Sequence, residues 1–342
     1  MEYLGTDKQI NHILPLVSVR VGTYNHEAYI SKCLDSILVQ KTTFPFEILV
    51  GEDSSTDNTR SICIEYAKKH TDKIRLFLRR EEEKILINGR PTGKMNNFKT
   101  RNAARGKYIA LCDGDDYWMD PEKLQKQVDF LEKHPEFVLA FHDARMVDEH
   151  DNFLSVGGLT EKLKKDGTGL DLISGKWLPT LTVMFRNILP KTMPPGYFKV
   201  YNGDAFLYTL LGHHGGAKYV EDIKPAHYRK HAGGIWSALK QKEKYEQMLN
   251  TRTQLVSIVD KRYRWAVKKQ VFSSSIFLSP YLPGFYLKLK QYAYSYQYFE
   301  FRPEFLKAFF EVHYILIKKT VAKIIRKITI SPKRTKHDPI TK

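Results

Sequence analysis

The chain of 342 residues is 42% hydrophobic and 27% charged, a composition typical of a globular protein with room for two modest domains. Its three cysteines fit neither a disulfide framework nor a zinc-binding spacing, and no run of 18 apolar residues predicts a membrane-spanning helix. Because the N-terminus also lacks the pattern of a signal peptide, we expect the chain in a reducing, cytoplasmic compartment.

The positive charge is concentrated toward the C-terminus. Residues 237–342 contain 22 Lys or Arg and 7 Asp or Glu, a net charge of +15 out of the +17 of the whole chain. The first 236 residues are therefore nearly neutral. A nucleic-acid or membrane partner must consequently be argued from the C-terminal third alone.

Strands and helices alternate along the first two thirds of the chain. Polar and Gly/Pro-containing residues at 79–99 predict a loop. The order of elements predicts an α/β fold with a mostly parallel mixed sheet flanked by helices. Apolar patterns predict strands at residues 14–21, 46–50, 74–78, 108–112, 137–141, 180–185, 217–220 and 226–228, and helices at 29–39, 60–70, 96–104, 120–134 and 205–211.

The most informative stretch is the buried-strand pattern at 108–112, which is followed at once by Asp113, Asp115 and Asp116. Carboxylates this close repel one another unless a positive charge lies among them. A divalent cation would relieve the repulsion, and oxygen ligands favour Mg²⁺ or Mn²⁺. Ligands of open α/β sheets also bind just beyond the carboxyl ends of strands. The alternative is a plain acidic turn before the next helix, with Asp120 as the helix N-cap.

Four sequence motifs extend the picture beyond these acids. They read V-S-V-R-V-G-T-Y-N at 17–25, V-G-E-D-S-S-T-D-N-T at 50–59, G-K-Y-I-A-L-C-D-G-D-D-Y-W at 106–118 and Y-R-K-H-A-G-G-I-W-S at 228–237. Together they resemble the inverting family 2 glycosyltransferases, over about residues 14–240. The resemblance implies a GT-A fold, a nucleotide-sugar donor (most often a UDP-sugar) and a divalent metal, Mn²⁺ or Mg²⁺. The second motif departs from the commoner Asp-Asp-Gly form but retains an acid at Asp53.

The resemblance also implies how the donor would be held. Asp53 would accept a hydrogen bond from the base, and Asp113 would reach the ribose. Asp115 would bind the metal that bridges the diphosphate, with Asp113 and His231 as further metal ligands. The residues implied to bind the nucleotide-sugar are Thr23, Tyr24, Asn25, Asp53, Asn97 and Asp113. For His231 the alternative is an ordinary loop or core histidine.

A transfer to a hydroxyl also needs a general base, and one base acting from one face leads to inversion at the anomeric carbon. Asp204 matches the acidic position that the family has between the D-x-D motif and the distal histidine. We therefore expect Asp204 to be the catalytic base. The alternative is that Asp204 is the N-cap of the helix that follows it, where a carboxylate would be a weaker base.

We expect a GT-A catalytic domain at residues 1–240, with a nucleotide-sugar half at 14–120 and an acceptor half at 121–240, and a helical, basic, aromatic-rich extension at 241–342. In the extension, a helix from Pro303 to about Ile328 has an apolar face and a basic face. The pattern predicts an interfacial helix on anionic lipid, and the alternative is a helix packed on the catalytic domain. The apolar face comprises Leu306, Phe310, Ile317, Val321, Ile324 and Ile328, and the basic face Lys318, Lys319, Lys323 and Arg326.

These expectations converge on a metal-dependent inverting glycosyltransferase in cell-surface polysaccharide synthesis, peripheral on the inner face of the cell membrane. It would transfer a sugar from the donor to a glycan or a lipid-linked acceptor. One alternative is a basic nucleic-acid-binding protein that uses the aromatic and lysine residues of the C-terminal third. Another is a nucleotidyltransferase on a related fold, which the missing glycine-rich basic loop after the first strand disfavours.

Overall fold

The structure is a computed structural model that describes residues 2–3, 14–154, 158–234 and 236–330, with the backbone alone at 319–320 and 323–330. It contains two compact units, Met1–Val267 and Lys268–Lys342, and each is described by itself.

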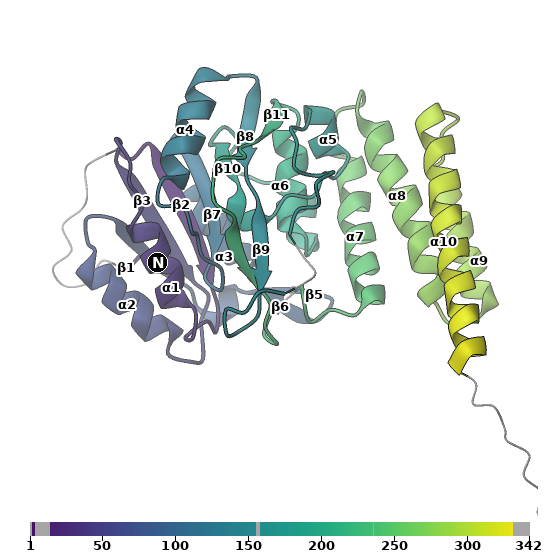
Figure 1. Cartoon of the computed structure of the whole chain (residues 1–342), viewed down its shortest axis with the longest axis horizontal. Coiled ribbons are helices and arrows are strands. Elements are labelled where there is room, and N and C mark those ends of the chain that lie inside the picture. Colours follow the sequence, from purple (N-terminus) through teal and green to yellow (C-terminus); the bar gives the residue numbers. More distant parts are fainter. Residues whose placement is uncertain (1, 4–13, 155–157, 235, 331–342) are drawn as a thin grey trace, which may run out of the picture. The chain divides into compact units, whose positions relative to one another are not determined.

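An eight-stranded mixed sheet forms the centre of the first unit (Figure 1). Four neighbouring strands, β4, β3, β2 and β7, run parallel. Strand β10 is antiparallel to both of its neighbours, β8 and β11 are parallel, and β1 is antiparallel to β4. The expected mostly parallel mixed sheet is therefore confirmed. In spatial order the strands are β1 (Glu2–Tyr3), β4 (Ile74–Leu78), β3 (Phe46–Glu52), β2 (Val17–Thr23), β7 (Tyr108–Asp113), β10 (Met184–Arg186), β8 (Phe137–Phe141) and β11 (Gly216–Tyr219).

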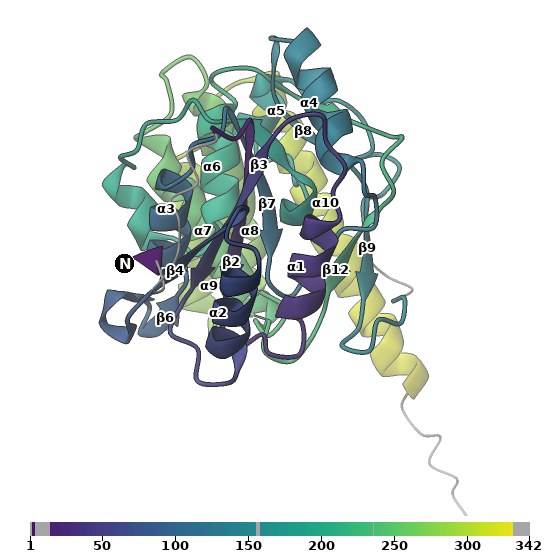
Figure 2. The same ribbon diagram turned by 90° about the vertical axis from the view of Figure 1, so that its left-hand side faces the viewer.

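Helices cover both faces of the sheet, as Figure 2 shows for α1 on one side and α3 and α6 on the other. Successive side chains of β7 point to opposite faces of the sheet. Ala110 packs into the core between the sheet and α1, α2 and α4, whereas Ile109 and Leu111 pack into the core between the sheet and α5 and α6. The helices of the first face are α1 (Ile30–Leu38), α2 (Thr59–Lys69) and α4 (Lys123–Lys133), and those of the second are α3 (Lys94–Asn102), α5 (Gly169–Ile173) and α6 (Gly203–Leu211).

The register of the parallel strands brings their carboxyl ends to one edge. Gly22 lies opposite Asp113, and Thr23 lies opposite Glu52. A short parallel pair, β9 (Ala144–Val147) and β12 (Ala226–Arg229), approaches the same edge, because His227 forms an isolated bridge with Tyr117. The segments that follow β2, β3, β7 and β12 therefore meet at one place, although they are far apart in the sequence.

Three local expectations need correction. The segment 79–99 contains a hairpin of β5 (Ile85–Ile87) and β6 (Arg90–Thr92) and the start of α3, instead of a loop. Residues 180–182 form a 3₁₀ turn instead of a strand, because the Thr182 hydroxyl donates to the Pro179 carbonyl at 2.7 Å.

The third correction concerns the start of α4, which begins at Lys123, so that Asp120 is not its N-cap. Asp120 instead accepts the backbone N–H groups of Glu122 at 2.9 Å and Lys224 at 3.0 Å. It stabilises the turn before the helix and ties that turn to a distant loop.

The first unit extends beyond residue 240. Helix α7 (Gln241–Val256) contributes Leu255 to a cluster with Ile173 and Phe206, and Val259 joins the same cluster. The structure therefore divides the chain after Val267, and α7 folds with the sheet domain although we assigned it to the extension.

The second unit consists of most of α8 (Arg264–Leu278), α9 (Phe285–Tyr296) and α10 (Pro303–Ile330). Its interior holds Phe272, Phe305 and Val312, and the predicted start of the last helix at Pro303 is confirmed. Leu306, Phe310, Ile317 and Val321 of the predicted apolar face are exposed. Lys318 of the predicted basic face is exposed as well. The side chains of the remaining members lie outside the described residues: Lys319, Lys323 and Arg326 of the basic face, and Ile324 and Ile328 of the apolar face. No helix among the described residues is long and apolar enough to cross a membrane.

Candidate active site

A tight turn at residues 113–116 presents the predicted acids. The Gly114 N–H donates to the Gly22 carbonyl at 2.9 Å, and the Asp116 N–H donates to the Asp113 carbonyl at 3.0 Å. A Cβ atom on Gly114 would lie 2.7 Å from the Thr23 hydroxyl oxygen and 3.0 Å from Nδ1 of His26. Glycine is therefore required between the two acids, because the turn packs against the segment that follows β2.

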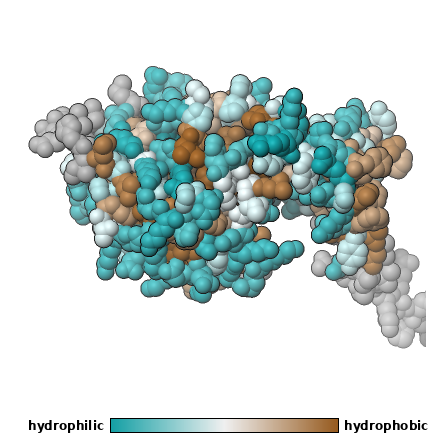
Figure 3. Space-filling model, turned by 90° about the horizontal axis from the view of Figure 1, so that it is seen from above, coloured by the Kyte–Doolittle hydropathy of each residue, from teal (hydrophilic) through white to brown (hydrophobic). Residues whose placement is uncertain are grey.

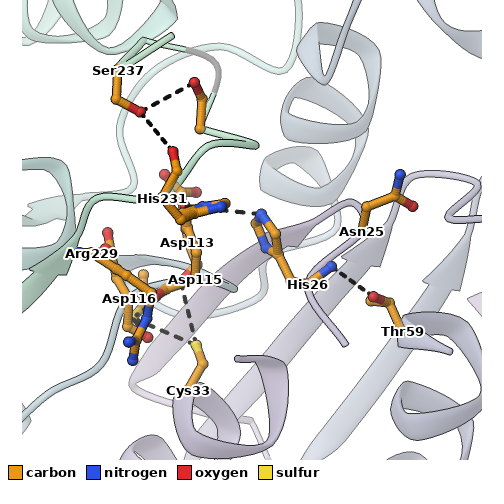
Figure 4. A network of polar contacts seen from close by, with 12 residues as sticks. Asn25, His26, Cys33, Thr59, Asp113, Asp115, Asp116, Arg229, His231 and Ser237 are labelled. Carbon is orange, nitrogen blue, oxygen red and sulfur yellow. Dashed lines mark hydrogen bonds and ion pairs between the residues drawn. The ribbon is translucent and has the colours of Figure 1, made fainter. Parts of the chain in front are cut away.

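Asp115 meets two histidines from different parts of the chain (Figure 4). Oδ2 of Asp115 lies 3.1 Å from Nε2 of His231 and 3.9 Å from Nε2 of His26. One ligand atom of each residue lies within 4.8 Å of those of the other two, and this is the one such His/Cys/Asp/Glu group within the described segments. The structure thus unites the predicted Asp115 and His231 and adds His26, which sequence reasoning missed.

The polar atoms in and beside this group are suited to binding a ligand from solution. Burial alone would raise the pKa of Asp115, but its hydrogen bond with His231 and the nearby His26 lower the pKa below the usual value. Among the described residues, Nδ1 of His26 and the Thr23 hydroxyl are buried without a hydrogen-bond partner. One carboxylate and two imidazoles form a set of donors that a divalent transition metal accepts.

Asp113 has a different partner. Its Oδ1 lies 3.1 Å from Nη2 of Arg20, which is buried and also bonds Asn97 through Nη1. The Asp113 side chain is 40% exposed, so its free oxygen can reach a ligand. The ion pair with Arg20 therefore does not block the predicted contact of Asp113 with a ribose. A role of Asp113 as a metal ligand stays a prediction, since Asp113 is outside the group of His26, Asp115 and His231.

Asp116 and Arg229 form the base of the site. Asp116 is buried and accepts the backbone N–H of Arg229 at 2.8 Å, and burial followed by the charge of Asp115 raises its pKa well above the usual value. The Arg229 guanidinium donates to the Asp115 carbonyl at 3.0 Å and to the carbonyls of Asp148 and Glu149 at 3.0 and 3.2 Å. Arg229 thus joins three segments next to the group of His26, Asp115 and His231.

Asp53 lies beside the predicted base-binding residues. Its N–H donates to the Thr23 carbonyl at 3.0 Å, and its side chain is buried. Burial raises the pKa of Asp53 to about 6, against the opposing charge of Lys84. The Lys84 ammonium also lies 3.9 Å from the centroid of the Tyr24 ring. Lys84 is therefore near both Tyr24 and Asp53, which follow the carboxyl ends of β2 and β3.

Asn25 and Asn97 have structural partners within the site. Asn25 adopts a left-handed conformation with φ of 54°, and its side-chain oxygen accepts the Thr56 N–H at 2.9 Å. Asn97 projects from the first turns of α3 toward Arg20. Both side chains are therefore held by structural partners, and their contacts with a donor stay predictions.

Asp204 lies in the first turn of α6, whose N-cap is Asn202. The helix begins at Gly203, so Asp204 is not the N-cap that the alternative required. Burial raises the pKa of Tyr228 in β12, and the charges of Asp116, Asp115, Asp113 and, least, Asp204 add to this shift. The role of Asp204 as the base stays a prediction.

Residues 18–178 match the family model for glycosyl transferase family 2. The chain contains a family 2 glycosyltransferase domain. The matched range includes His26, Asp53, Asp113 and Asp115 but ends before Asp204 and His231. The position of His231 beside Asp115 therefore rests on the structure alone.

Comparisons with a curated relative and with a solved structure add sequence and fold similarity. An uncharacterized protein of Mycobacterium tuberculosis is 34% identical over 229 residues, which cover 65% of this chain and 61% of the relative. The chain thus spans less than two thirds of that relative's length. TarS residues 1–349 from S. aureus, solved in complex with UDP-GlcNAc, has a TM-score of 0.59 at 19% identity, over 85% of this chain and 81% of TarS 1–349.

A second solved structure is the mannosyltransferase PcManGT from Pyrobaculum calidifontis in complex with GDP-Man and Mn²⁺. It has a TM-score of 0.51 at 15% identity, over 88% of each chain. At these identities the two structures establish the fold only, a GT-A-type α/β fold, for the family 2 glycosyltransferase domain.

Three members of the site were not identified from the sequence motifs: His26, Arg20 and Arg229. His26 directly follows Thr23-Tyr24-Asn25 at the carboxyl end of β2, which is the sequence signal that could have found it. Arg20 and Arg229 lie inside strands, where a charged side chain facing an interior requires a partner. Buried arginines in apolar strand patterns were therefore a second available signal.

Proposed function

We propose that the chain is a metal-dependent inverting glycosyltransferase that moves a sugar from a nucleotide-sugar to an acceptor hydroxyl. The observation that carries the proposal is the meeting of Asp115, His26 and His231 at the edge of the sheet where Asp53 also lies. A nucleoside diphosphate needs both features, a cation for the phosphates and a hydrogen-bond acceptor for the base. TarS 1–349 was solved with UDP-GlcNAc and PcManGT with GDP-Man and Mn²⁺, which supports such a donor.

We favour Mn²⁺ over Mg²⁺ as the metal. Two of the three candidate ligands are imidazoles, and Mg²⁺ prefers oxygen ligands and retains its waters. A metal held by Asp115, His26 and His231 would stabilise the negative charge that grows on the departing nucleoside diphosphate. The chain contains no glycine-rich loop to supply that stabilisation in another way.

The residues of the chain would share the remaining tasks. Asp53 would accept a hydrogen bond from a base N–H, which favours uracil, and Tyr24 would offer its ring to the base. Asp113, oriented by Arg20, would accept a hydrogen bond from a ribose hydroxyl. Asp204 would take the proton of the acceptor hydroxyl as that oxygen attacks the anomeric carbon from the face opposite the leaving group, with inversion.

The acceptor and the place of action are proposed from the second unit. This unit carries exposed apolar and aromatic side chains, including Phe285, Phe301 and Phe310, and Figure 3 shows hydrophobic residues gathered over its helices. Exposed Lys288, Lys290, Lys307 and Lys318 lie among them. Apolar side chains interleaved with lysines suit an anionic membrane surface. We therefore propose a lipid-linked acceptor or a glycan, used in polysaccharide synthesis by a protein peripheral on the inner face of the cell membrane.

A nucleic-acid-binding function is the second candidate, and it rests on the same lysines. We disfavour it because binding of single-stranded nucleic acid requires aromatic rings beside a basic groove, whereas the acidic candidate site lies in the first unit, which carries only +6 of the net charge of +17. A nucleotidyltransferase would also use clustered acids and a metal. The absence of a glycine-rich basic loop after β2 argues against it.

A panel of nucleotide-sugars, with release of the nucleoside diphosphate as the readout, tests the proposal. We expect release from one UDP-sugar with Mn²⁺, less with Mg²⁺ and none with a chelator. Asp204→Asn should retain donor binding but lose at least about 100-fold in transfer, the usual contribution of a general base. Full transfer by Asp204→Asn would remove Asp204 as the base, and no release from any donor would contradict the proposed reaction.

A further inference from the structure

Tyr29 is an aromatic residue beside the candidate metal site that the proposed mechanism does not use. It is the N-cap of α1, and its side chain is half-buried. The centroid of its ring lies 4.9 Å from that of His231 and 6.3 Å from that of His26. The two imidazoles lie 5.8 Å from each other, with an angle of 81° between their planes. The three rings therefore form one cluster, in which Tyr29 contacts both imidazoles.

A cation contacts the same tyrosine ring. The guanidinium carbon of Arg229 lies 4.7 Å from the centroid of Tyr29, which is within the range of a cation–π contact. Arg229 also donates to the Asp115 carbonyl at 3.0 Å. Tyr29 thus contacts both imidazoles and the arginine that holds the Asp115 turn.

His231 requires such a contact because a loop carries it. The loop follows β12 and contains Gly233 and Gly234, and the His231 carbonyl accepts the Gly234 N–H at 3.2 Å. Among the described residues, the imidazole has one hydrogen-bond partner, the Asp115 carboxylate at 3.1 Å. The last side-chain torsion of histidine has a broad energy minimum, so one hydrogen bond does not fix the plane of the ring. Packing against other side chains must fix it instead.

His26 and Tyr29 are tied to each other through the backbone. The His26 carbonyl accepts the N–H groups of Tyr29 at 2.9 Å and of Ile30 at 2.8 Å, which closes a turn at the start of α1. Ile30 is fully buried in the core between the sheet and α1. The packed helix therefore anchors His26 and Tyr29 together, and the tyrosine ring extends from this anchored turn to the loop histidine.

A metal site benefits from support of this kind. Residues around the ligands orient the imidazoles, and their substitution typically weakens metal binding by roughly 10- to 100-fold. Aromatic rings are also stabilised by tilted packing at centroid distances of about 4.5 to 7 Å. An imidazole that binds a divalent cation becomes electron-poor, which strengthens its contact with an electron-rich phenol ring. The tyrosine ring therefore restricts the orientations of both imidazoles and favours their metal-bound state.

We propose that Tyr29 is a positioning residue for the metal ligands: its ring fixes the planes of the His26 and His231 imidazoles. This inference rests on the proposed role of the two histidines as ligands of Mn²⁺. The contacts that carry it involve the ring of Tyr29 and not its hydroxyl. Phenylalanine should therefore replace Tyr29 in this role, whereas an aliphatic residue should not.

Isothermal titration of the full chain with Mn²⁺ alone tests the role, for wild type, Tyr29→Leu and Tyr29→Phe. We expect Tyr29→Leu to weaken Mn²⁺ binding roughly 10-fold or more, because the imidazoles lose the ring that orients them. Tyr29→Phe retains the ring and should bind Mn²⁺ with an affinity close to that of wild type. An equal loss of affinity in the two variants would contradict the inference, because the hydroxyl would then be responsible.

The visible absorption of bound Co²⁺ provides a second readout, which a loss of stability alone would not change. Co²⁺ accepts imidazole and carboxylate ligands, and its spectrum depends on the geometry of those ligands. At saturating Co²⁺ we expect an altered spectrum in Tyr29→Leu and the wild-type spectrum in Tyr29→Phe. A wild-type spectrum in Tyr29→Leu would show that the ligands keep their orientation without the ring, and would overturn the role.

Tyr66→Leu is the matched control. The ring centroid of Tyr66 lies 6.1 Å from that of His70, so this tyrosine also contacts an imidazole, but at α2 and away from the group of candidate ligands. We expect Tyr66→Leu to leave the Mn²⁺ affinity unchanged even if its Tm falls. If Tyr66→Leu weakened Mn²⁺ binding as much as Tyr29→Leu, general loss of stability would explain both, and the inference would be wrong.

The result for His26→Ala separates the inference from the function on which it rests. If His26→Ala retains the wild-type affinity for Mn²⁺, His26 is not a ligand and the proposed set of metal ligands is wrong. If His26→Ala loses affinity while Tyr29→Leu does not, only the positioning role of Tyr29 is overturned.

Discussion

At the scale of single residues, the site is a set of side chains whose partners explain their chemistry. Asp115 and His231 were expected together from their motifs, and the structure places them 3.1 Å apart. His26 was not expected, because a lone histidine after a strand is ambiguous in a sequence. Which strand ends face one another depends on the register of β2 against β7, which no local pattern specifies.

The role of His26 as a metal ligand is testable by metal binding. His26→Ala should weaken Mn²⁺ binding by roughly 10- to 100-fold, because one of three ligands is lost, and Asp115→Ala should weaken it further. Isothermal titration with Mn²⁺ alone measures both. His213→Ala is the control, because His213 lies outside the group and its Nδ1 bonds the Thr209 carbonyl. Unchanged Mn²⁺ affinity in His26→Ala would exclude it as a ligand.

The protonation of Asp53 predicts a pH dependence of donor binding. Burial raises the pKa of Asp53 to about 6, so the carboxyl is ionised at pH 7.5 and becomes protonated as the pH falls through 6. A protonated carboxyl loses its capacity to accept the base N–H at that oxygen. UDP affinity, measured by titration between pH 5 and 8, should therefore fall below about pH 6, and it should be weak and flat in Asp53→Asn. A wild-type affinity that is constant across the range would contradict this role.

At the scale of elements, the site depends on short connections that local patterns describe poorly. The long apolar strands and amphipathic helices were predicted because burial on one face imposes a period on the sequence. The β5–β6 hairpin and the 3₁₀ turn at 180–182 were missed, because three-residue elements have no such period. Their positions depend on individual hydrogen bonds, such as the one that the Trp118 indole N–H donates to the Leu181 carbonyl at 2.8 Å.

The loop at 148–151 acts as a brace on the site through Asp151. Its carboxylate accepts from Arg229 and Tyr117 at 2.8 Å each and from Lys32 at 2.5 Å. Burial alone would raise the pKa of Asp151, but the bonds from Lys32, Tyr117 and Arg229 lower it to about 2. A carboxyl with a depressed pKa stabilises the fold above its unfolded pKa of about 3.9, and this stability is lost as the pH falls toward 2.

Asp151→Asn should accordingly lower Tm at pH 7, and the difference from wild type should shrink below about pH 4. Thermal unfolding monitored at several pH values measures this. Asp166→Asn serves as a comparison, since Asp166 pairs with Lys218 at 3.2 Å outside the site. An equal effect of the two substitutions, or a difference independent of pH, would argue against a brace at Asp151.

At the scale of the whole molecule, the chain combines a first unit of net charge +6 with a smaller second unit of net charge +11. The charge asymmetry was evident from the sequence, and so was the last helix. The boundary was placed too early, because α7 is highly charged and its few apolar contacts with Ile173 and Phe206 depend on the tertiary fold. Composition predicted the properties of the extension, whereas packing determined where it begins.

The exposed apolar face of α10 predicts binding to anionic vesicles. Burial of one large apolar side chain contributes about 1.5 to 3 kcal/mol. The double substitution Phe310→Asp with Ile317→Asp should therefore lower partitioning into phosphatidylglycerol-containing vesicles by roughly 100-fold or more.

Co-sedimentation of the full chain measures this, with phosphatidylcholine vesicles and RNA as competing partners. Ile188→Asp changes an exposed apolar residue of the first unit and should leave binding unchanged. A salt-dependent shift with RNA, without vesicle binding, would favour the nucleic-acid alternative instead.

We propose that a metal held at Asp115 drives transfer from a nucleotide-sugar. Release of UDP from a UDP-sugar by wild type and by Asp115→Ala, measured across a Mn²⁺ titration, tests this most directly. We expect release that rises with Mn²⁺ in wild type and that is less than about 1% of the wild-type rate in Asp115→Ala at every concentration, because each 1.4 kcal/mol of lost charge stabilisation lowers the rate about tenfold. Release by Asp115→Ala at the wild-type rate, unaffected by a chelator, would contradict it.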